Sequence, residues 1–192
     1  MSPMIKTPLT MEYVLLGFLQ QRPMHAYEIH QTLMQAKAIG LVWNIKQSQL
    51  YAHITRLEDE GYVTGILEPQ QARPARKVLR LTPAGEAAVA DWISTPVAHG
   101  REFRLEFLAK LFFASQHDAL TLERLIASQR QASVFLIERL TDAVAALAPE
   151  RHFDRLVLRF RIGQLEASIV WLAECAQTFA TPTTPLTVLP AL

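Results

Sequence analysis

The chain has 192 residues, of which 50% are hydrophobic and 19% are charged, and its formal net charge at pH 7 is +1. This composition is typical of a globular protein with one or two cores and argues against an extensively disordered chain. The apolar run at residues 13–19 is too short for a membrane span, so we expect a cytoplasmic protein without membrane contact. Cys175 is the only cysteine, which excludes an intrachain disulfide and favours a small core residue.

The N-terminal part of the chain predicts two helices separated by a proline. Residues 1–8 show no periodicity, and we expect them to form a loose arm. Thr10 can cap the first helix, and Pro23 ends it. We expect the second helix at about residues 24–36, followed by a short strand at residues 43–45 that can pair with a later hairpin.

Residues 49–60 predict a third helix with one buried stripe. Leu50, Ile54 and Leu57 recur at i, i+4 and i+7. Ser48 is a natural N-cap, and Gly61 is a natural residue for the position after the helix. Polar and cationic side chains fall on the other faces, namely those of Gln47, Gln49, Tyr51, His53 and Arg56.

A basic hairpin is predicted after this helix. Two extended runs at residues 62–67 and 77–81 flank a polar tip that contains prolines. Between Pro69 and Leu81 the charged residues are all basic, namely Arg73, Arg76, Lys77 and Arg80. Amide and hydroxyl side chains can read base edges while guanidinium groups neutralise phosphates. Helix, strand, basic loop and strand is the order of a winged helix-turn-helix, although an ordinary solvated hairpin is the alternative interpretation.

The remainder of the chain predicts helices. Thr82 and Pro83 begin a fourth helix, and the segment STPVAHG at residues 94–100 interrupts the pattern. We therefore expect a fold that is mainly α with a small β-wing. Its predicted parts are a winged-helix domain at residues 1–95, a helical domain at 101–180 and a flexible tail at 181–192. The helical domain predicts three helices, at about residues 102–115, 118–148 and 150–179.

The last of these helices has two apolar stripes, which one neighbour in a three-helix unit cannot cover. A second copy can cover such a surface, so we expect a two-fold homodimer rather than a monomeric bundle. The stripe predicted to form the interface is Leu158, Ile162, Leu165, Ile169 and Leu172. Beside or opposite it lie Phe153, Leu156, Phe160, Ala167, Val170 and Trp171. A two-fold axis would place two recognition helices about 34–36 Å apart on a palindromic operator.

Several stretches resemble the PadR family of transcriptional regulators, named for repressors that respond to phenolic acids. They are LLGFLQQRPMHAYEIHQTL, SQLYAHITRLEDEGYV, RKVLRLTPAG, EFLAKLFF and SIVWLAECA, and the resemblance spans residues 9–179. Ala26 departs from the glycine that is usual in the family. The resemblance implies a winged helix-turn-helix domain, a C-terminal antiparallel helical dimerisation domain and repression of a neighbouring gene. The double-stranded DNA contacts that it implies are Gln47, Ser48, Gln49, Tyr51, Arg56, Arg73, Arg76 and Lys77.

The resemblance also implies a small aromatic effector. Phe107, Phe112 and Trp171, with Arg104 and Arg161 to hold a carboxylate, can line a pocket for it. The alternative interpretation is that the aromatic side chains are core and that the arginines form surface ion pairs.

The sequence also bears on two other classes of function, an enzyme and a protein-binding module. The six histidines are scattered, and the sequence contains no HExxH, paired-cysteine, GxSxG or phosphate-loop pattern. We therefore expect neither an enzyme nor a bound metal or cofactor. The second alternative is a winged-helix module that binds acidic proteins instead of a specific DNA target.

Overall fold

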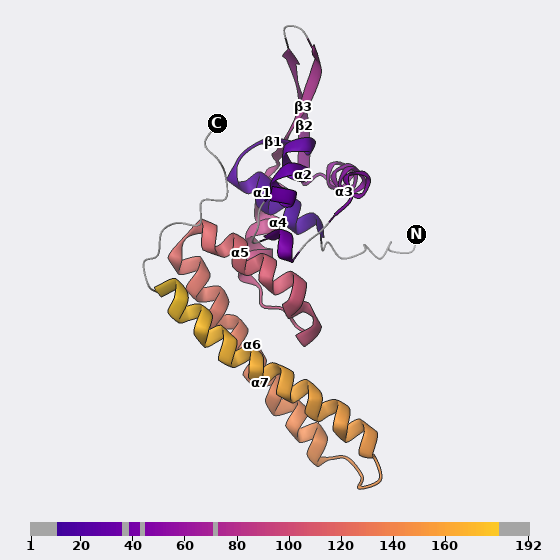
Figure 1. Cartoon of the computed structure of the whole chain (residues 1–192), viewed down its shortest axis with the longest axis vertical. Helices are drawn as coiled ribbons and strands as arrows, with labels where there is room; N and C mark the ends of the chain where they lie inside the picture. The colour runs from indigo at the N-terminus through magenta and orange to yellow at the C-terminus, as the bar shows by residue number, and fades with distance from the viewer. Residues whose placement is uncertain (1–10, 36–38, 43–44, 71–72, 181–192) are drawn as a thin grey trace. The chain divides into compact units, whose positions relative to one another are not determined.

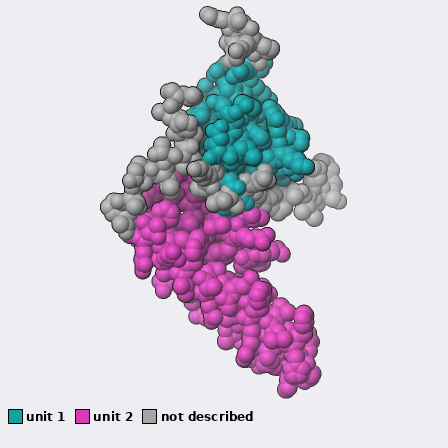
Figure 2. Space-filling model, in the orientation of Figure 1, with its two compact units in different colours: residues 1–92, 188–192 teal, residues 93–187 magenta. Residues whose placement is uncertain are grey.

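The computed structural model describes residues 11–35, 39–42, 45–70 and 73–180. The chain divides into two compact units, with the change from unit 1 to unit 2 between Trp92 and Ile93 (Figure 2). This division lies slightly before the boundary expected at residues 95–100. The predicted N-terminal arm, the C-terminal tail and residues 43–44 of the predicted strand lie outside the described residues.

Unit 1 contains four helices and a three-stranded antiparallel sheet within the described residues (Figure 1). Its elements are α1 (Met11–Gln21), β1 (Met24–His25), α2 (Ala26–Gln35), the 3₁₀ turn η1 (Ile39–Leu41), α3 (Gln47–Asp59), β2 (Val63–Gln70), β3 (Arg73–Leu81) and α4 (Pro83–Ser94). The strand order is β1-β3-β2. The hairpin β2–β3 extends beyond the two runs predicted from the sequence, and its pairing shifts register between Glu68 and Gln70.

The third strand of the sheet is not the one expected from the sequence. Met24 pairs with Leu79 and His25 with Val78, whereas Ile45 is in no strand. Met24 follows Pro23 and is buried, so the extended backbone there places an apolar side chain in the core. Glu28 accepts a hydrogen bond from the backbone N–H of His25 (2.7 Å). This capping hydrogen bond places the start of α2 at Ala26, two residues later than predicted.

The core of unit 1 forms where α1 and α3 bury their apolar faces. Leu50, Ile54 and Leu57 are buried, which confirms the predicted stripe of α3. Gly61 has φ +78°, a left-handed conformation that favours glycine, as expected after this helix. The start of α3 differs from the prediction, because it begins at Gln47 and the N-cap is Lys46 rather than Ser48.

Unit 2 contains helices and no strand among the described residues. It contains the 3₁₀ turn η2 (Gly100–Glu102), the π-helical turn η3 (Phe103–Phe107), α5 (Leu108–His117), α6 (Ala119–Ala145) and α7 (His152–Ala180). The first predicted helix of this region is thus divided into three pieces. α6 and α7 form a long antiparallel hairpin (Figure 1). Of the helices in the described ranges, none is both long and apolar enough to cross a membrane.

Candidate nucleic-acid interface

The exposed face of α3 is polar at its N-terminal end. Gln47, Ser48 and Tyr51 are exposed, as the predicted groove contacts need to be. Gln49 is exposed as well, but its side-chain oxygen accepts a hydrogen bond from the backbone N–H of Lys46 (3.1 Å). Gln49 therefore caps its own helix in this structure and would have to leave that bond to contact a base.

Arg56 is partly buried and is paired with two carboxylates of unit 1. Its Nη1 lies 2.8 Å from Glu12 Oε1, and its Nε lies 2.9 Å from Glu60 Oε1. Glu12, on α1, is only 2% exposed and also contacts His53 Nδ1 at 3.0 Å. A buried carboxylate needs such partners because an unpaired buried charge is strongly unfavourable.

These contacts give Arg56 a structural role that the sequence did not predict. Its hydrogen bond to Glu60 and the negative charge of Glu12 hold the pKa of Arg56 above its usual value. The guanidinium thus fastens α3 to α1, and we leave Arg56 out of the proposed DNA contacts. The partner was missed because Glu12 is 44 residues away in the sequence.

The wing β2–β3 carries the basic side chains. Arg76 and Arg80 are exposed on β3, opposite Glu68 and Thr64 of β2. Arg80 belongs to the predicted basic run, although the sequence alone predicts no contact for it. Arg73 is the first residue of β3, and its backbone pairs with Gln70.

Lys77 is also on β3, but it already has an acidic partner. Its Nζ lies 2.6 Å from Glu58 Oε1 of α3. The ion pair crosses Gly65 so closely that a Cβ there would overlap Cε of Lys77. Gly65 therefore permits the bridge between the wing and α3, and a phosphate would have to compete with Glu58 for Lys77.

The residues predicted to hold an effector do not form one pocket. Phe107 is fully buried, and its ring packs edge-on against that of Trp171, with centroids 6.1 Å apart. Arg104 is exposed and does not line the hollow that contains Arg161. Arg161 lines a separate hollow beside His99. Phe107 and Trp171 are part of the core packing, because their rings contact each other.

The stripe of α7 that is predicted to form the dimer interface is largely covered within the chain. Leu165 and Leu172 are buried within the chain, and Leu158, Ile162 and Ile169 are half-buried on the same stripe. α7 packs on α6, so this stripe is already covered within one chain. The other stripe is exposed, at Phe153 (76%), Leu156 (66%), Phe160 (65%) and Val170 (72%).

Cys175 behaves as a core residue. Burial, assisted by the neighbouring Glu174, raises the pKa of its thiol to about 11. The thiol is therefore protonated at neutral pH and is a poor nucleophile. Among the residues that the structure describes, no three His, Cys, Asp or Glu side chains gather as a metal site would require.

The sheet order, the polar face of α3 and the basic strand β3 define unit 1 as a winged helix-turn-helix DNA-binding domain. Residues 15–91 match the model of the Transcriptional regulator PadR-like family, and residues 103–180 match Virulence activator alpha C-term. The Negative transcriptional regulator PadR of Bacillus subtilis is 26% identical over 171 residues, covering 84% of this chain and 93% of that protein. A probable transcriptional regulator of Mycobacterium tuberculosis is 28% identical over 157 residues, covering 73% of this chain and 83% of its own length.

The chain is also similar to solved structures. The crystal structure of Bacillus subtilis PadR in complex with operator DNA is 22% identical, covers 90% of this chain and 99% of its own, and has a TM-score of 0.46. The same protein in complex with p-coumaric acid is 21% identical, covers 89% and 99%, and has a TM-score of 0.40. Residues 15–91 thus match a family of transcriptional regulators, and the curated relatives that are similar along most of the chain are transcriptional regulators rather than enzymes.

Proposed function

We propose that the protein is a homodimeric repressor that binds a palindromic operator and is released by a small aromatic acid. The observation that carries the proposal is the exposed polar face of α3 in the same unit as an exposed basic wing. The name of the Bacillus subtilis relative, a negative regulator, supports repression as the outcome.

The assignment of DNA contacts follows from exposure and charge. Gln47, Ser48 and Tyr51 are available to base edges and phosphates in a major groove. Arg76 and Arg80 project from the wing without an ion pair among the described residues, so phosphates are their natural partners.

The dimer is supported by the exposed stripe of α7. Its members recur with alternating spacings of three and four residues, the pattern that places side chains along one seam between two helices. They are Phe153, Leu156, Phe160, Gly163, Ala167 and Val170. A Cβ at Gly163 would meet nothing within 4 Å, so the middle of the stripe is open. Large exposed aromatic side chains around small central residues suit close approach of the same helix from a second copy.

The DNA-binding proposal is tested by selecting sequences from a random duplex pool with the full-length protein. Affinity for the enriched site is then measured across a salt series. Arg73→Ala with Arg76→Ala should weaken binding to every duplex and reduce the log–log salt slope by about 2, because each phosphate contact contributes about 0.9. Gln47→Ala should mainly blur the base preference, and Arg159→Ala, an exposed arginine of α7, is the control.

Failure to enrich any site, even at low salt, would contradict the DNA-binding proposal. It would favour the alternative of a winged-helix module that binds proteins. An unchanged salt slope in the double variant, with a site still enriched, would contradict only the role given to the wing.

The dimer has its own test, which does not depend on DNA. Phe160→Glu with Val170→Glu places two carboxylates in the exposed stripe of α7 and should convert the protein to a monomer in sedimentation velocity. The control is Leu120→Glu, which adds a charge at an exposed apolar residue of α6 outside the stripe. A dimer that survives the double change would assign the interface to another surface.

A further inference from the structure

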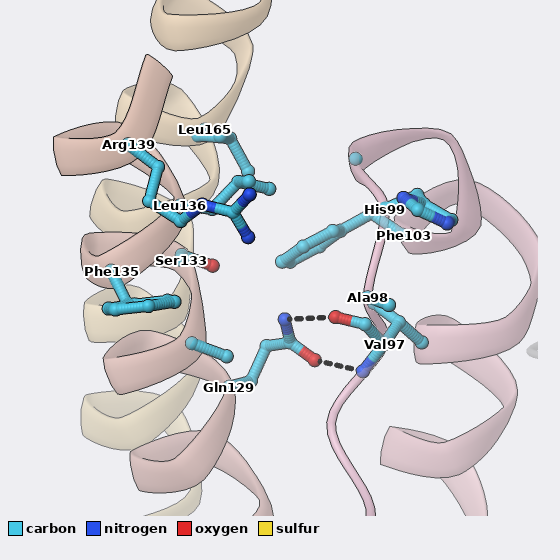
Figure 3. Close-up of a pocket in the computed structure, with 12 residues that line it drawn as sticks. Val97, Ala98, His99, Phe103, Gln129, Ser133, Phe135, Leu136, Arg139 and Leu165 are labelled. Atoms are coloured by element: carbon cyan, nitrogen blue, oxygen red, sulfur yellow. Dashed lines mark hydrogen bonds between the residues drawn. The ribbon is translucent and has the colours of Figure 1, made fainter. Parts of the chain in front are cut away.

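Polar links between segments that are distant in the sequence differ in how far solvent reaches them. In unit 2, Gln129 is 1% exposed, and its amide holds the backbone N–H (2.7 Å) and carbonyl oxygen (3.2 Å) of Val97 (Figure 3). In unit 1, Lys77 of β3 is paired with Glu58 of α3, and their side chains are 49% and 23% exposed. A partly exposed ion pair contributes little to the stability of a fold, so stability alone does not account for this pair.

The pair of Lys77 and Glu58 joins the wing to the recognition helix. Lys77 Nζ lies 2.6 Å from Oε1 of Glu58 and donates a hydrogen bond to Oε2 at 2.8 Å. The carbonyl oxygen of the same lysine accepts a hydrogen bond from Nδ1 of His25 on β1 (3.0 Å). Lys77 is therefore held through its side chain by α3 and through its main chain by β1. These two contacts fix the middle of β3 relative to both elements.

Gly65 of β2 leaves the space that the ion pair occupies. A Cβ at Gly65 would overlap Cε of Lys77, and it would lie 2.8 Å from Cγ of Lys77 and 2.9 Å from Oε1 of Glu58. The backbone itself does not require glycine there, because Gly61 is the only described residue with a positive φ. The three nearest atoms belong to the ion pair, so the pair is the reason that a side chain does not fit.

The exposed arginines of β3 point to the other side of the wing. Successive residues of a strand point to opposite faces, so Arg76 and Arg80 share one face and Lys77 lies on the other. Both arginines are exposed, whereas the face of Lys77 also carries Leu79, which is 1% exposed. Lys77 thus lies on a side of the wing that packs on the body of unit 1, and the two arginines remain available for phosphates.

We propose that Lys77 and Glu58 are positioning residues for DNA binding, and that Lys77 is not itself a phosphate contact. The pair holds the wing at a fixed place beside α3, so that Arg76 and Arg80 reach phosphates when α3 occupies the groove. A loosely held wing would have to be ordered on binding, which lowers affinity. This inference rests on the proposed function, since it assigns the residues that align its two DNA-contacting elements.

Charge alone predicts the opposite effect for Glu58. DNA is a polyanion, so removal of a carboxylate should strengthen binding if that carboxylate only repels phosphates or competes with them for Lys77. Removal of a positioning carboxylate should instead weaken binding. The sign of the change in affinity therefore separates the two roles.

The test measures the affinity of the full-length protein for the operator selected from the random duplex pool. Glu58→Gln and Lys77→Gln should each weaken binding about threefold to fivefold, the most that a partly exposed pair supplies. The two changes should agree in sign and size, because each breaks the same pair. The control is Asp59→Asn, which removes an exposed carboxylate one residue further along α3 and should leave the affinity unchanged or raise it.

Gly65→Ala breaks the pair without changing any charge. The new methyl group must displace the end of the Lys77 side chain, which costs little because that flexible end can move into solvent. Alanine at an ordinary φ also reduces the entropy of the unfolded chain, so the melting temperature should not fall. Operator affinity should nevertheless fall about threefold to fivefold. A glycine needed only for the fold would instead lower the melting temperature.

A charge exchange separates positioning from phosphate contact. Glu58→Lys combined with Lys77→Glu restores an ion pair with its charges reversed, and the net charge of the protein stays the same. Operator affinity should return to within about twofold of that of the unmodified protein, because the link is rebuilt. If Lys77 bound a phosphate, a carboxylate in its place would weaken binding well beyond either single change.

Three results would overturn this assignment. They are an operator affinity in Glu58→Gln at or above that of the unmodified protein, an unchanged affinity in Gly65→Ala, and a folded charge-exchanged protein that binds no better than Lys77→Gln. Circular dichroism checks folding, and the first two results decide the matter if the exchanged protein does not fold. Any of these results alongside a site enriched by the unmodified protein rejects the positioning role alone, whereas failure to enrich any site rejects the proposed function.

Discussion

Glu12 of α1 is the residue that links α1 to the recognition helix α3. The variant Glu12→Ala measures how much this link contributes to the free energy of unfolding. The carboxylate is 2% exposed and accepts hydrogen bonds from Arg56 (2.8 Å) and His53 (3.0 Å). Breaking a fully buried ion pair costs about 3–5 kcal/mol. The side chains of Arg56 and His53 are 28% and 31% exposed and can be rehydrated, and Arg56 keeps Glu60. We therefore expect Glu12→Ala to lower the free energy of unfolding by about 2–3 kcal/mol.

The measurement is urea unfolding followed by tryptophan fluorescence in a Trp171→Phe background. The remaining tryptophans, Trp43 and Trp92, both precede residue 93, so the signal reports on the unit that contains Glu12. Asp59→Ala, which removes an exposed carboxylate at the end of α3, is the control and should change stability by less than about 0.5 kcal/mol. If Glu12→Ala were no more destabilising than this control, the cluster would not fasten α3 to α1.

Three further changes test other contacts. Gly85→Ala should lower the melting temperature, because the added Cβ would overlap the carbonyl oxygen of Tyr62. Alanine ordinarily stabilises a helix by about 1 kcal/mol relative to glycine, so a stabilised variant would contradict this close approach. Asp118 caps α6, and hydrogen bonds from Thr121 and His117 hold the pKa of its carboxyl well below the usual value. The ionised carboxylate therefore stabilises the folded protein fully above about pH 4, and this stabilisation is lost as the pH falls further. In acid titrations of melting temperature, Asp118→Asn should keep the cap and flatten this loss, and an unchanged titration would refute the assignment. Cys175 should react with a disulfide reagent at pH 8 only after unfolding, and rapid native labelling would contradict its burial.

Local pattern was enough to predict the class of this protein. The buried stripe of α3 is set by the spacing of Leu50, Ile54 and Leu57, and the end of the helix is marked by Gly61. Both signals involve residues within a few turns of helix, so they can be interpreted without the tertiary structure. The two strands after Gly61, of which the second is basic, then complete a winged helix, and the order of these elements carries the resemblance to PadR regulators. Helix ends were predicted less well, because competing caps such as Ser48 and Lys46 differ by small energies.

Contacts between distant residues were decided only by the folded chain. The sequence predicted two apolar stripes on the last helix, but packing on α6 selected the stripe of Leu165 and left that of Phe160 exposed, since either stripe is apolar enough to be buried. Arg56 was predicted to contact DNA, and only the folded chain shows that a buried carboxylate from another helix is its partner. The ion pair of Lys77 and Glu58 across Gly65 is likewise visible only in three dimensions. A sequence determines which side chains can pair, whereas the tertiary structure determines which do, because burial and partnership depend on segments that only folding brings together.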